Sequence, residues 1–269
     1  IQSCVVPGDN IEQQGSDWKR GEVIVPAGTR VGAREMALLF EAGVKRVAGW
    51  ASPRVAVVAT GSEITQEADG LSSGFRRCSN AFYIAALMSR IGVTDIRTIV
   101  VPDDIRQLTR TLVELDAVCD VIITVGGTGK GKRDYTRQAV SDAGGVFVGH
   151  DTQLDSPFVT ARLPHAGLIG LPGNPLAVMM IVQCVLLESV RSVFHLPEAP
   201  AQTVEAVMTE DIEAGICGEL CVNVNESAAK PLIKGTGRMR VFDSARGFVR
   251  LNGQGIKRGE RVRVELFRN

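Results

Sequence analysis

Short apolar runs alternate with amphipathic segments from Pro53 to about His195, and this alternation constrains the fold more than any other feature of the chain. Each run is typical of a strand buried on both faces, and strands that alternate with helices form right-handed crossovers in a mostly parallel sheet. The predicted strands are Val55–Ala59, Thr98–Val101, Val121–Val125, Val146–Val148 and Leu168–Leu171, and the predicted helices are Asn80–Ile91, Asp103–Leu115, Asp134–Asp142 and Leu176–Phe194. We therefore expect a three-layer α/β domain at residues 51–196.

The residues before this domain have a different pattern. Gly21–Thr29 combines turn signals with short apolar runs, which predicts a hairpin-like β segment. From Gly32 the apolar residues recur at helical spacing up to Gly43, a residue type that often ends helices. Residues 1–50 are therefore expected to form a small attachment with a short β/α segment.

After residues 197–200 the hydrophobic period changes to two, as in Arg261–Leu266, and this alternation predicts a small antiparallel β domain at residues 197–269. Its charge is uneven: residues 196–229 hold seven acidic and no basic side chains, whereas residues 230–269 hold eleven basic and three acidic ones. The basic region is either a docking face for an anionic partner or a solvated barrel face.

Composition excludes several other classes of protein. The 269 residues contain 30 basic and 30 acidic side chains, so charge gives no reason to expect nucleic acid or a membrane surface as a partner. The longest uncharged stretch, Ala166–Leu187, is interrupted by Pro172 and Pro175, which argues against one membrane-spanning helix. Six scattered cysteines and no signal-like opening segment indicate a cytoplasmic protein with free thiols.

The strongest chemical signal is the glycine-rich segment after the predicted strand Val121–Val125. Glycines allow left-handed backbone and a close approach to a ligand, and free N–H groups beside a helix start favour phosphate. Asp134 ends the segment either as a helix cap or as a carboxylate that faces a metal ion. Gly126–Lys132 also fits the first seven positions of a P-loop, but Arg133 replaces the Ser or Thr that would bind Mg²⁺. A degenerate nucleotide hydrolase is therefore a weak alternative.

Two further polar loops follow predicted strands. Thr60–Glu63 comes after Val55–Ala59, and Glu63 is either a metal ligand or general base, or a helix-start carboxylate. Pro172–Pro175 comes after Leu168–Leu171, where Asn174 and Pro175 also fit a helix cap and first turn. Because ligands of parallel sheets bind at the carboxyl ends of the strands, we expect the three loops to form one pocket.

These three loops, in this order, resemble the molybdopterin-binding domain of molybdenum cofactor biosynthesis proteins. The flanking regions resemble the MoeA/gephyrin type of molybdopterin molybdenumtransferase, so the resemblance covers almost the whole chain. It implies a partial N-terminal linker domain at residues 1–50 and a β-barrel-like C-terminal domain at residues 197–269. It also implies a homodimer, other cofactor-synthesis proteins as partners, and molybdopterin or its adenylate, nucleotide, Mg²⁺ and molybdate as ligands. Asp134 and Glu63 would be the catalytic and Mg²⁺-binding carboxylates. The implied ligand-binding residues are Thr60, Gly61, Ser62, Gly126, Gly127, Thr128, Gly129, Lys130, Gly131, Lys132, Arg133, Pro172, Gly173, Asn174 and Pro175.

The chain also departs from the transferase pattern. Ser62 replaces the aspartate of a Thr-Gly-Asp-Glu loop, and Val125–Gly129 is closer to the MogA/MoaB adenylyltransferase branch. Residues 155–158 stand where the transferase has a Lys-Pro-Gly-Lys-Pro stretch, and the family's N-terminal region has no counterpart. Two hypotheses follow: an enzyme of Mg²⁺-dependent molybdate insertion or adenylyl transfer, and a non-catalytic molybdopterin-binding carrier or scaffold.

Overall fold

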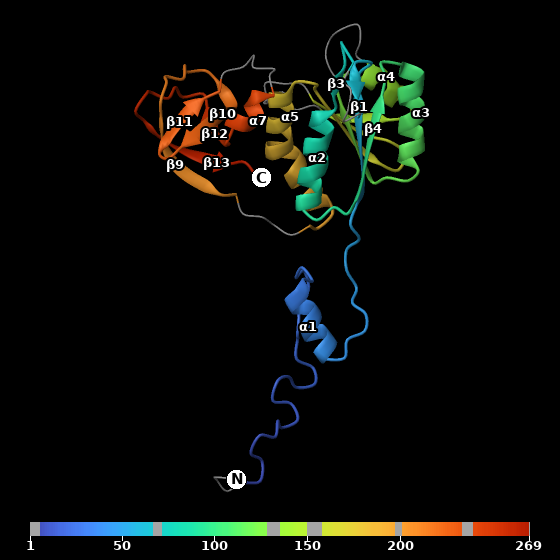
Figure 1. Cartoon of the computed structure of the whole chain (residues 1–269), viewed down its shortest axis with the longest axis vertical. Coiled ribbons are helices and arrows are strands. Elements are labelled where there is room, and N and C mark those ends of the chain that lie inside the picture. The colour runs from blue at the N-terminus through green and yellow to red at the C-terminus, as the bar shows by residue number, and fades with distance from the viewer. Residues whose placement is uncertain are drawn as a thin grey trace. The chain divides into compact units, whose positions relative to one another are not determined.

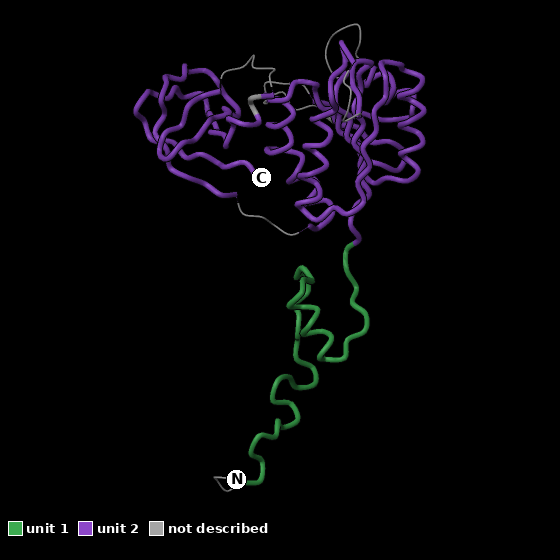
Figure 2. Tube along the Cα trace, in the orientation of Figure 1, with its two compact units in different colours: residues 1–50 green, residues 51–269 purple. Residues whose placement is uncertain are grey.

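A computed structural model describes residues 6–66, 72–127, 135–149, 158–196, 201–232 and 239–268. The chain divides into two units, residues 1–50 and residues 51–269, which are coloured separately in Figure 2.

The first unit contains one helix, α1 (Ala33–Glu41), in its described part. Gly43 has a φ of 74° and donates its N–H to the Phe40 carbonyl at 2.9 Å, while the Val44 N–H reaches the Leu39 carbonyl at 2.9 Å. These two bonds form a Schellman motif, which needs a left-handed residue and so selects glycine. The prediction that the helix ends at Gly43 is confirmed.

The hairpin-like β segment predicted at Gly21–Thr29 is absent. This segment contains turns instead, with the Glu22 N–H bonded to the Lys19 carbonyl at 3.1 Å and the Thr29 N–H bonded to the Pro26 carbonyl at 3.2 Å. No strand is present among residues 6–50, so the segment has no described partner for a ladder. The side chain of Val23 is exposed. The turn residues here do not belong to a hairpin, because neither flank buries an apolar face.

The second unit contains a six-stranded sheet in the order β4-β1-β5-β8-β7-β6 (Figure 1). Neighbouring strands among the first four are parallel, whereas β7 is antiparallel to both of its neighbours. The strands are β1 (Arg54–Thr60), β4 (Asp95–Val101), β5 (Val121–Val125), β6 (Val146–Gly149), β7 (Val159–Arg162) and β8 (Gly167–Leu171). The mostly parallel sheet is therefore confirmed, with one strand more than predicted.

The sequence analysis missed β7. Its four residues alternate between buried and more exposed positions, so they lack the continuous apolar run that marks the other strands. The strand joins β8 through a tight turn in which the Leu163 N–H bonds to the Ala166 carbonyl at 2.9 Å. A hairpin of this kind turns β7 antiparallel to β8 without a crossover helix.

Helices cover both faces of the sheet, as Figure 1 shows. Val55, Val57 and Ala59 of β1 pack in one core with α2 (Ser79–Arg90). Ala56 and Val58 pack in a second core with α3 (Ile105–Asp116) and α4 (Tyr135–Asp142). Alternate residues of one strand thus face opposite layers, which confirms the three-layer prediction.

The predicted helix at Leu176–Phe194 is interrupted. It consists of α5 (Pro175–Ile181), a π-helical turn η1 (Val182–Leu186) and α6 (Leu187–Val193). Length and composition alone would let Pro175–Val193 cross a membrane. In the structure, Ile181 belongs to the sheet-side core, while Met179 and Met180 of the same helix pack against residues of the β domain. Burial on two sides explains the apolar composition.

The π-helical turn presents Gln183 to the end of the chain. The side chain is buried, its Nε2 donates to the Tyr83 hydroxyl at 3.0 Å and to the Arg268 carbonyl at 2.9 Å, and its Oε1 accepts the Arg268 N–H at 2.9 Å. All of these bonds join residues more than 80 positions apart. The helix and the β domain are therefore fixed to each other at this point.

The C-terminal β domain is a closed five-stranded barrel in the order β10-β11-β9-β13-β12. Its strands are β9 (Thr203–Met208), β10 (Cys217–Asn225), β11 (Ala228–Pro231), β12 (Gly247–Asn252) and β13 (Arg261–Leu266). The elements outside the sheet and the barrel are β2 (Ile64–Thr65), β3 (Arg76–Arg77) and α7 (Arg240–Ser244). The predicted small β domain is present, but β11 and β9 pair in parallel, because a closed ring of five strands cannot be antiparallel at every pair.

Part of the basic C-terminal charge is paired within the barrel. Arg250 contacts Glu265 at 2.7 Å and Glu219 at 3.4 Å, and Arg263 lies opposite Glu205 in the strand register. The alternation of exposed Arg261 and Arg263 with buried residues follows the pleat of β13. This arrangement agrees with the interpretation as a solvated barrel face.

The start of β1 carries an ion pair that makes stability depend on pH. Arg54 contacts both Asp120 oxygens, with Nη2–Oδ1 at 2.8 Å and Nε–Oδ2 at 3.2 Å, and its N–H donates to Oδ2 at 2.8 Å. The Arg54 side-chain hydrogen bonds hold the pKa of Asp120 below its ordinary value. A lowered pKa stabilises the folded protein above the ordinary value, and this contribution is lost as the pH falls toward the folded value.

We expect Asp120→Asn to lower the thermal unfolding midpoint by about 1–4 °C at neutral pH, a small effect because the pair is partly exposed. Below about pH 4 the difference from wild type should shrink, because Asp120 then takes up a proton in the wild-type chain as well. Differential scanning calorimetry of both proteins across this range checks the expectation. An equal difference at pH 3 and pH 7 would contradict it.

Candidate functional site

The ends of the four parallel strands bring the predicted loops together. In the strand register, Thr60 lies opposite Val101, and Val125 lies beside Ala59 on one side and Leu171 on the other. The residues that follow are Thr60–Glu63 after β1, Pro102 and Asp103 after β4, Gly126 and Gly127 after β5, and Pro172–Asn174 after β8. One edge of the sheet therefore carries the described parts of all three predicted loops.

Backbone hydrogen bonds fix these loops to one another. The Gly126 N–H donates to the Leu171 carbonyl at 2.9 Å, and the Gly61 N–H donates to the Val101 carbonyl at 3.1 Å. The Thr60 hydroxyl bonds to the Val125 carbonyl at 3.3 Å. The sheet ladder thus continues for one residue beyond β1 and β5, so the loops after these two strands start from defined positions.

The two described glycines of the glycine-rich loop occupy positions that a larger residue would not fit. Gly126 has a φ of 102°, and a Cβ on it would lie 2.7 Å from Thr60 Oγ1 and 2.8 Å from the Thr60 carbonyl oxygen. Gly127 has a φ of 64°, and a Cβ there would lie 2.7 Å from Thr136 Oγ1. The rest of the predicted loop, Thr128, Gly129, Lys130, Gly131, Lys132, Arg133 and Asp134, lies outside the described residues.

Thr136 bonds to the backbone of this loop. It is fully buried in the first turn of α4, its hydroxyl donates to the Gly126 carbonyl at 3.1 Å, and its N–H meets the Gly127 carbonyl at 3.4 Å. These bonds occupy the two glycine carbonyls, so the loop backbone is held to the start of α4. A helix N-terminus beside free loop N–H groups is a favourable place for an anion.

The β1 loop presents carboxylates at the same edge. Ser62 and Glu63 are exposed, and a Cβ on Gly61 would lie 3.0 Å from Glu63 Oε2, so the Glu63 side chain folds back over Gly61. The Asp103 N–H donates to Ser62 Oγ at 3.1 Å, and the Ser62 N–H meets Asp103 Oδ2 at 3.4 Å. Sequence analysis missed Asp103 at the site, although it lies only two residues after a predicted strand.

The β8 loop has a structural role that the sequence analysis left open. Asn174 Oδ1 accepts the Leu176 N–H at 3.0 Å and the Ala177 N–H at 3.2 Å, and Pro175 is the first residue of α5. The Asn174 oxygen is therefore a helix cap. Gly173 lies against the glycine-rich loop, because a Cβ on it would be 3.9 Å from the Gly126 Cα.

Asn80 is a second residue that sequence analysis did not assign to the site. Its Nδ2 donates to the Gly173 carbonyl at 3.0 Å, which places the start of α2 beside the β8 loop. Its Oδ1 is buried and has no hydrogen-bond partner among the described residues. A buried acceptor without a partner is rare and indicates a place where a bound group can donate. The sequence showed Asn80 only as a helix start.

The cap at Asn174 gives a test of local stability. We expect Asn174→Ala to lower the free energy of unfolding by about 1 kcal/mol, because two N–H groups of α5 lose their acceptor. Asn174→Asp keeps an acceptor at the same place and should remain close to wild type. Urea denaturation of the three proteins measures both effects. Equal losses in the two variants would show that the cap is not what Asn174 contributes.

No group of three or more His, Cys, Asp or Glu side chains that could hold a metal ion is found in the described part of the chain. Asp134 lies outside that part, so Glu63 and Asp103 are the two candidate carboxylates that the structure describes at this edge. The described part of this edge thus has a left-handed glycine backbone, the exposed carboxylate of Glu63, the partly exposed carboxylate of Asp103, and one buried amide oxygen without a partner among the described residues. Such a set suits a polar, phosphate-bearing ligand.

Comparison with known proteins agrees with this geometry. A family model described as a probable molybdopterin binding domain matches residues 56–195. The molybdopterin molybdenumtransferase of Bacillus subtilis is 30% identical over 208 residues, which cover 76% of this chain and 48% of that protein. The corresponding enzyme of Haemophilus influenzae is 27% identical over 175 residues, covering 65% of this chain and 43% of that protein. The chain spans about half the length of these curated relatives.

A solved structure shows the same fold. The molybdopterin biosynthesis MoeA protein from Pyrococcus horikoshii matches with a TM-score of 0.78 and 24% identity, covering 94% of this chain and 64% of that chain. The family model covers more than half of the residues and includes the three strand-end loops. The chain therefore belongs to the MoeA-like family of molybdenum cofactor biosynthesis proteins that carry a molybdopterin-binding domain.

Proposed function

We propose that this protein binds molybdopterin, or its adenylate, at the carboxyl edge of the sheet. The observation that carries the proposal is the backbone at Gly126 and Gly127, which is left-handed and packed so closely on Thr60 and Thr136 that only glycine fits. Molybdopterin carries a terminal phosphate, and loop N–H groups with nearby basic side chains are suitable receptors for it. The loop sequence supplies these in Lys130, Lys132 and Arg133.

The described neighbours define the rest of the proposed site. Residues 126–131 and Gly173 with Asn174 would surround the phosphate, since the two loops lie against each other. The unpaired Asn80 Oδ1 would accept a hydrogen bond from an N–H group of the ligand. A ligand that filled this place would satisfy a buried polar atom that the described residues leave without a partner.

We further propose that Glu63 and Asp134 hold Mg²⁺. The exposed Glu63 carboxylate lies over Gly61 at the same edge as the glycine-rich loop, and a carboxylate oxygen is the kind of ligand that Mg²⁺ prefers. When bound, Mg²⁺ would neutralise negative charge on the oxygens of a phosphoanhydride. This assignment supports a Mg²⁺-dependent step, either insertion of molybdate or adenylyl transfer. From the family resemblance we also propose a cytoplasmic homodimer that works with other cofactor-synthesis proteins.

The proposal is tested by turnover of molybdopterin with Mg²⁺-ATP and molybdate, followed by analysis for adenylylated pterin and released AMP. We expect Asp134→Asn and Glu63→Gln each to lower turnover by about a hundredfold, as removal of a catalytic carboxylate does. Glu114→Gln, which removes an exposed carboxylate from α3, should leave turnover unchanged. Unchanged turnover in the Asp134 and Glu63 variants would overturn their assignment.

The same assay separates the alternatives. Binding of molybdopterin without formation or consumption of AMP would favour the carrier or scaffold hypothesis, which the replacement of the lysine stretch by residues 155–158 supports. ATP hydrolysis that needs no pterin would instead indicate a degenerate nucleotide hydrolase. No binding of molybdopterin would overturn the proposed function as a whole.

A further inference from the structure

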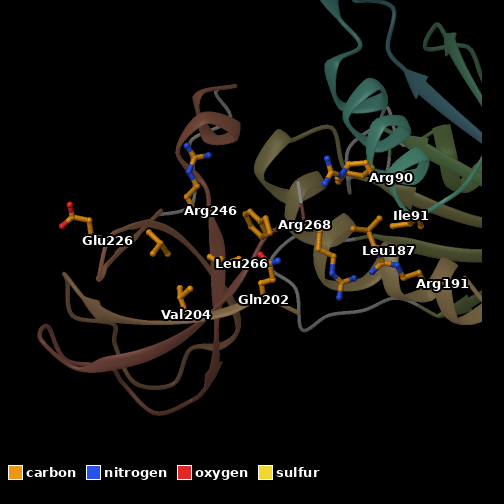
Figure 3. Close-up of a pocket in the computed structure, with 13 residues that line it drawn as sticks. Arg90, Ile91, Leu187, Arg191, Gln202, Val204, Glu226, Arg246, Leu266 and Arg268 are labelled. Atoms are coloured by element: carbon orange, nitrogen blue, oxygen red, sulfur yellow. The ribbon is translucent and has the colours of Figure 1, made fainter. Parts of the chain in front are cut away.

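A pocket of about 770 Å³ lies at the other end of α2 from the proposed molybdopterin site (Figure 3). Asn80, at the start of α2, bonds to Gly173 at the carboxyl edge of the sheet. The carbonyl of Gly92, just after α2, accepts from the Ser52 hydroxyl at 3.4 Å, and Ser52 precedes β1. The pocket is thus at the amino edge of the sheet, where α2 and α6 face the barrel.

Arginine is the dominant charged residue of this pocket. Arg90 at the end of α2 and Arg191 in α6 line it from the helices, and Arg246 and Arg268 line it from the barrel side. Glu226 is the one acidic side chain among the described lining residues. In Figure 3 it lies at the far side of the barrel and points away from Arg191. The lining residues on the helix side therefore include no carboxylate, and the acidic partner of Arg191 and Arg268 in the structure is Glu188 of α6, which is not among the lining residues.

Arg191 is the buried member of the cluster. The residue is only 8% exposed, and its Nη1 lies 3.3 Å from Glu188 Oε1. Arg268 Nη1 donates to this same Glu188 oxygen. Arg191 Nε is buried and has no hydrogen-bond partner among the described residues. Two guanidinium groups therefore share one carboxylate oxygen, and one buried donor is left over.

This arrangement is electrostatically incomplete. Burial lowers the pKa of Arg191, and the neighbouring charge of Arg268 lowers it further, although an arginine remains protonated at physiological pH. A buried charge without full compensation is costly to keep. Arg90 is exposed and takes part in no ion pair within the described residues, so its guanidinium is available on the same wall. An anion placed among these groups would supply the missing acceptors.

We propose that this pocket binds a small molecule that carries a phosphate group, held by Arg90, Arg191 and Arg268. Phosphate offers several acceptor oxygens and up to two negative charges, which matches separate guanidinium donors and a surplus of positive charge. The volume lies in the range of small-molecule pockets. Apolar side chains would contact the remainder of the molecule: Ile91, Leu187, Val204, Leu266 and Phe267.

The test titrates the full chain with inorganic phosphate and pyrophosphate by isothermal calorimetry at constant ionic strength. We expect Arg90→Gln/Arg268→Gln to weaken binding by about tenfold or more, because two charge-assisted donors are lost. The matched control is Arg106→Gln/Arg258→Gln, which removes the same charge from exposed positions outside the pocket and should bind as wild type. Succinate, a dicarboxylate, should bind clearly more weakly than phosphate.

Two further variants separate binding in this pocket from binding at the glycine-rich loop and from a folding defect. Lys130→Gln/Lys132→Gln changes the glycine-rich loop and should retain phosphate binding in the arginine pocket. Arg90→Gln alone leaves the Glu188 contacts intact, so a weaker affinity in this variant cannot arise from misfolding at Arg268. The proposal is overturned if no phosphate binds, if the pocket variants bind like their control, if only the lysine variant loses binding, or if succinate binds equally well.

Discussion

Replacing Gly126 by alanine is expected to abolish molybdopterin binding and to lower the free energy of unfolding by about 2–5 kcal/mol. Two effects add at this position. A residue with a side chain is strained at a φ of 102°, and its Cβ would lie within 2.8 Å of the Thr60 carbonyl oxygen and hydroxyl. Relief of this collision must move the β1 loop away from the β5 loop, which separates the two halves of the proposed site.

Two other glycines are matched controls for this variant. Gly92 has almost the same φ, 101°, with no atom within 4 Å of a Cβ, so Gly92→Ala carries the backbone strain without the collision. Gly173→Ala lies in the neighbouring loop of the proposed site and would make only an ordinary contact at 3.9 Å, so it is a control for the free energy of unfolding and not for binding. Urea denaturation and isothermal titration with molybdopterin measure all three. If Gly126→Ala binds as tightly as Gly92→Ala, the close packing at Gly126 is not needed by the site.

The second large effect is expected in the core under α3. Leu112→Ala should lower the free energy of unfolding by about 2–5 kcal/mol, because a fully buried leucine leaves a cavity when it is shortened. Leu112 packs in the core that contains Ala56 and Ile122 of the sheet. The lost free energy of unfolding therefore measures how much the packing of α3 on the sheet contributes to stability. Guanidinium or urea unfolding of the variant gives the value directly.

Val113→Ala provides the control on the same helix. Val113 is 52% exposed, and alanine has a better helix propensity, so this neighbour should change stability by less than about 0.5 kcal/mol. A similar loss in the two variants would mean that α3 does not pack on the sheet through Leu112.

The sheet could be predicted from the sequence because its central strands are buried on both faces. Val55–Ala59 has no polar residue to obscure the pattern, and the structure places all five of its side chains inside. The strand β7 is short and alternating, so the same rule did not find it. The π-helical turn at Gln183 depends on bonds to Tyr83 and Arg268, which are distant in the sequence. Local patterns hold no information on such partners.

The candidate site could likewise be predicted from the sequence only in part. The rule that ligands bind at the carboxyl ends of parallel strands was enough to bring Thr60–Glu63, Gly126–Gly127 and Pro172–Asn174 to one edge. Asn80 was not identified, because it reaches this edge from the start of a helix and its importance lies in an unpaired oxygen. The arginine pocket was not found for a similar reason: its four arginines come from four separate parts of the chain.

Titration of the full chain with molybdopterin tests the central claim most directly. The account predicts saturable binding of one molybdopterin per chain, which is lost in Gly126→Ala and retained in Gly92→Ala. Saturable binding that is equal in both variants would place the ligand away from the strand-end loops. No binding to the wild-type chain would contradict the claim that these loops form a molybdopterin site.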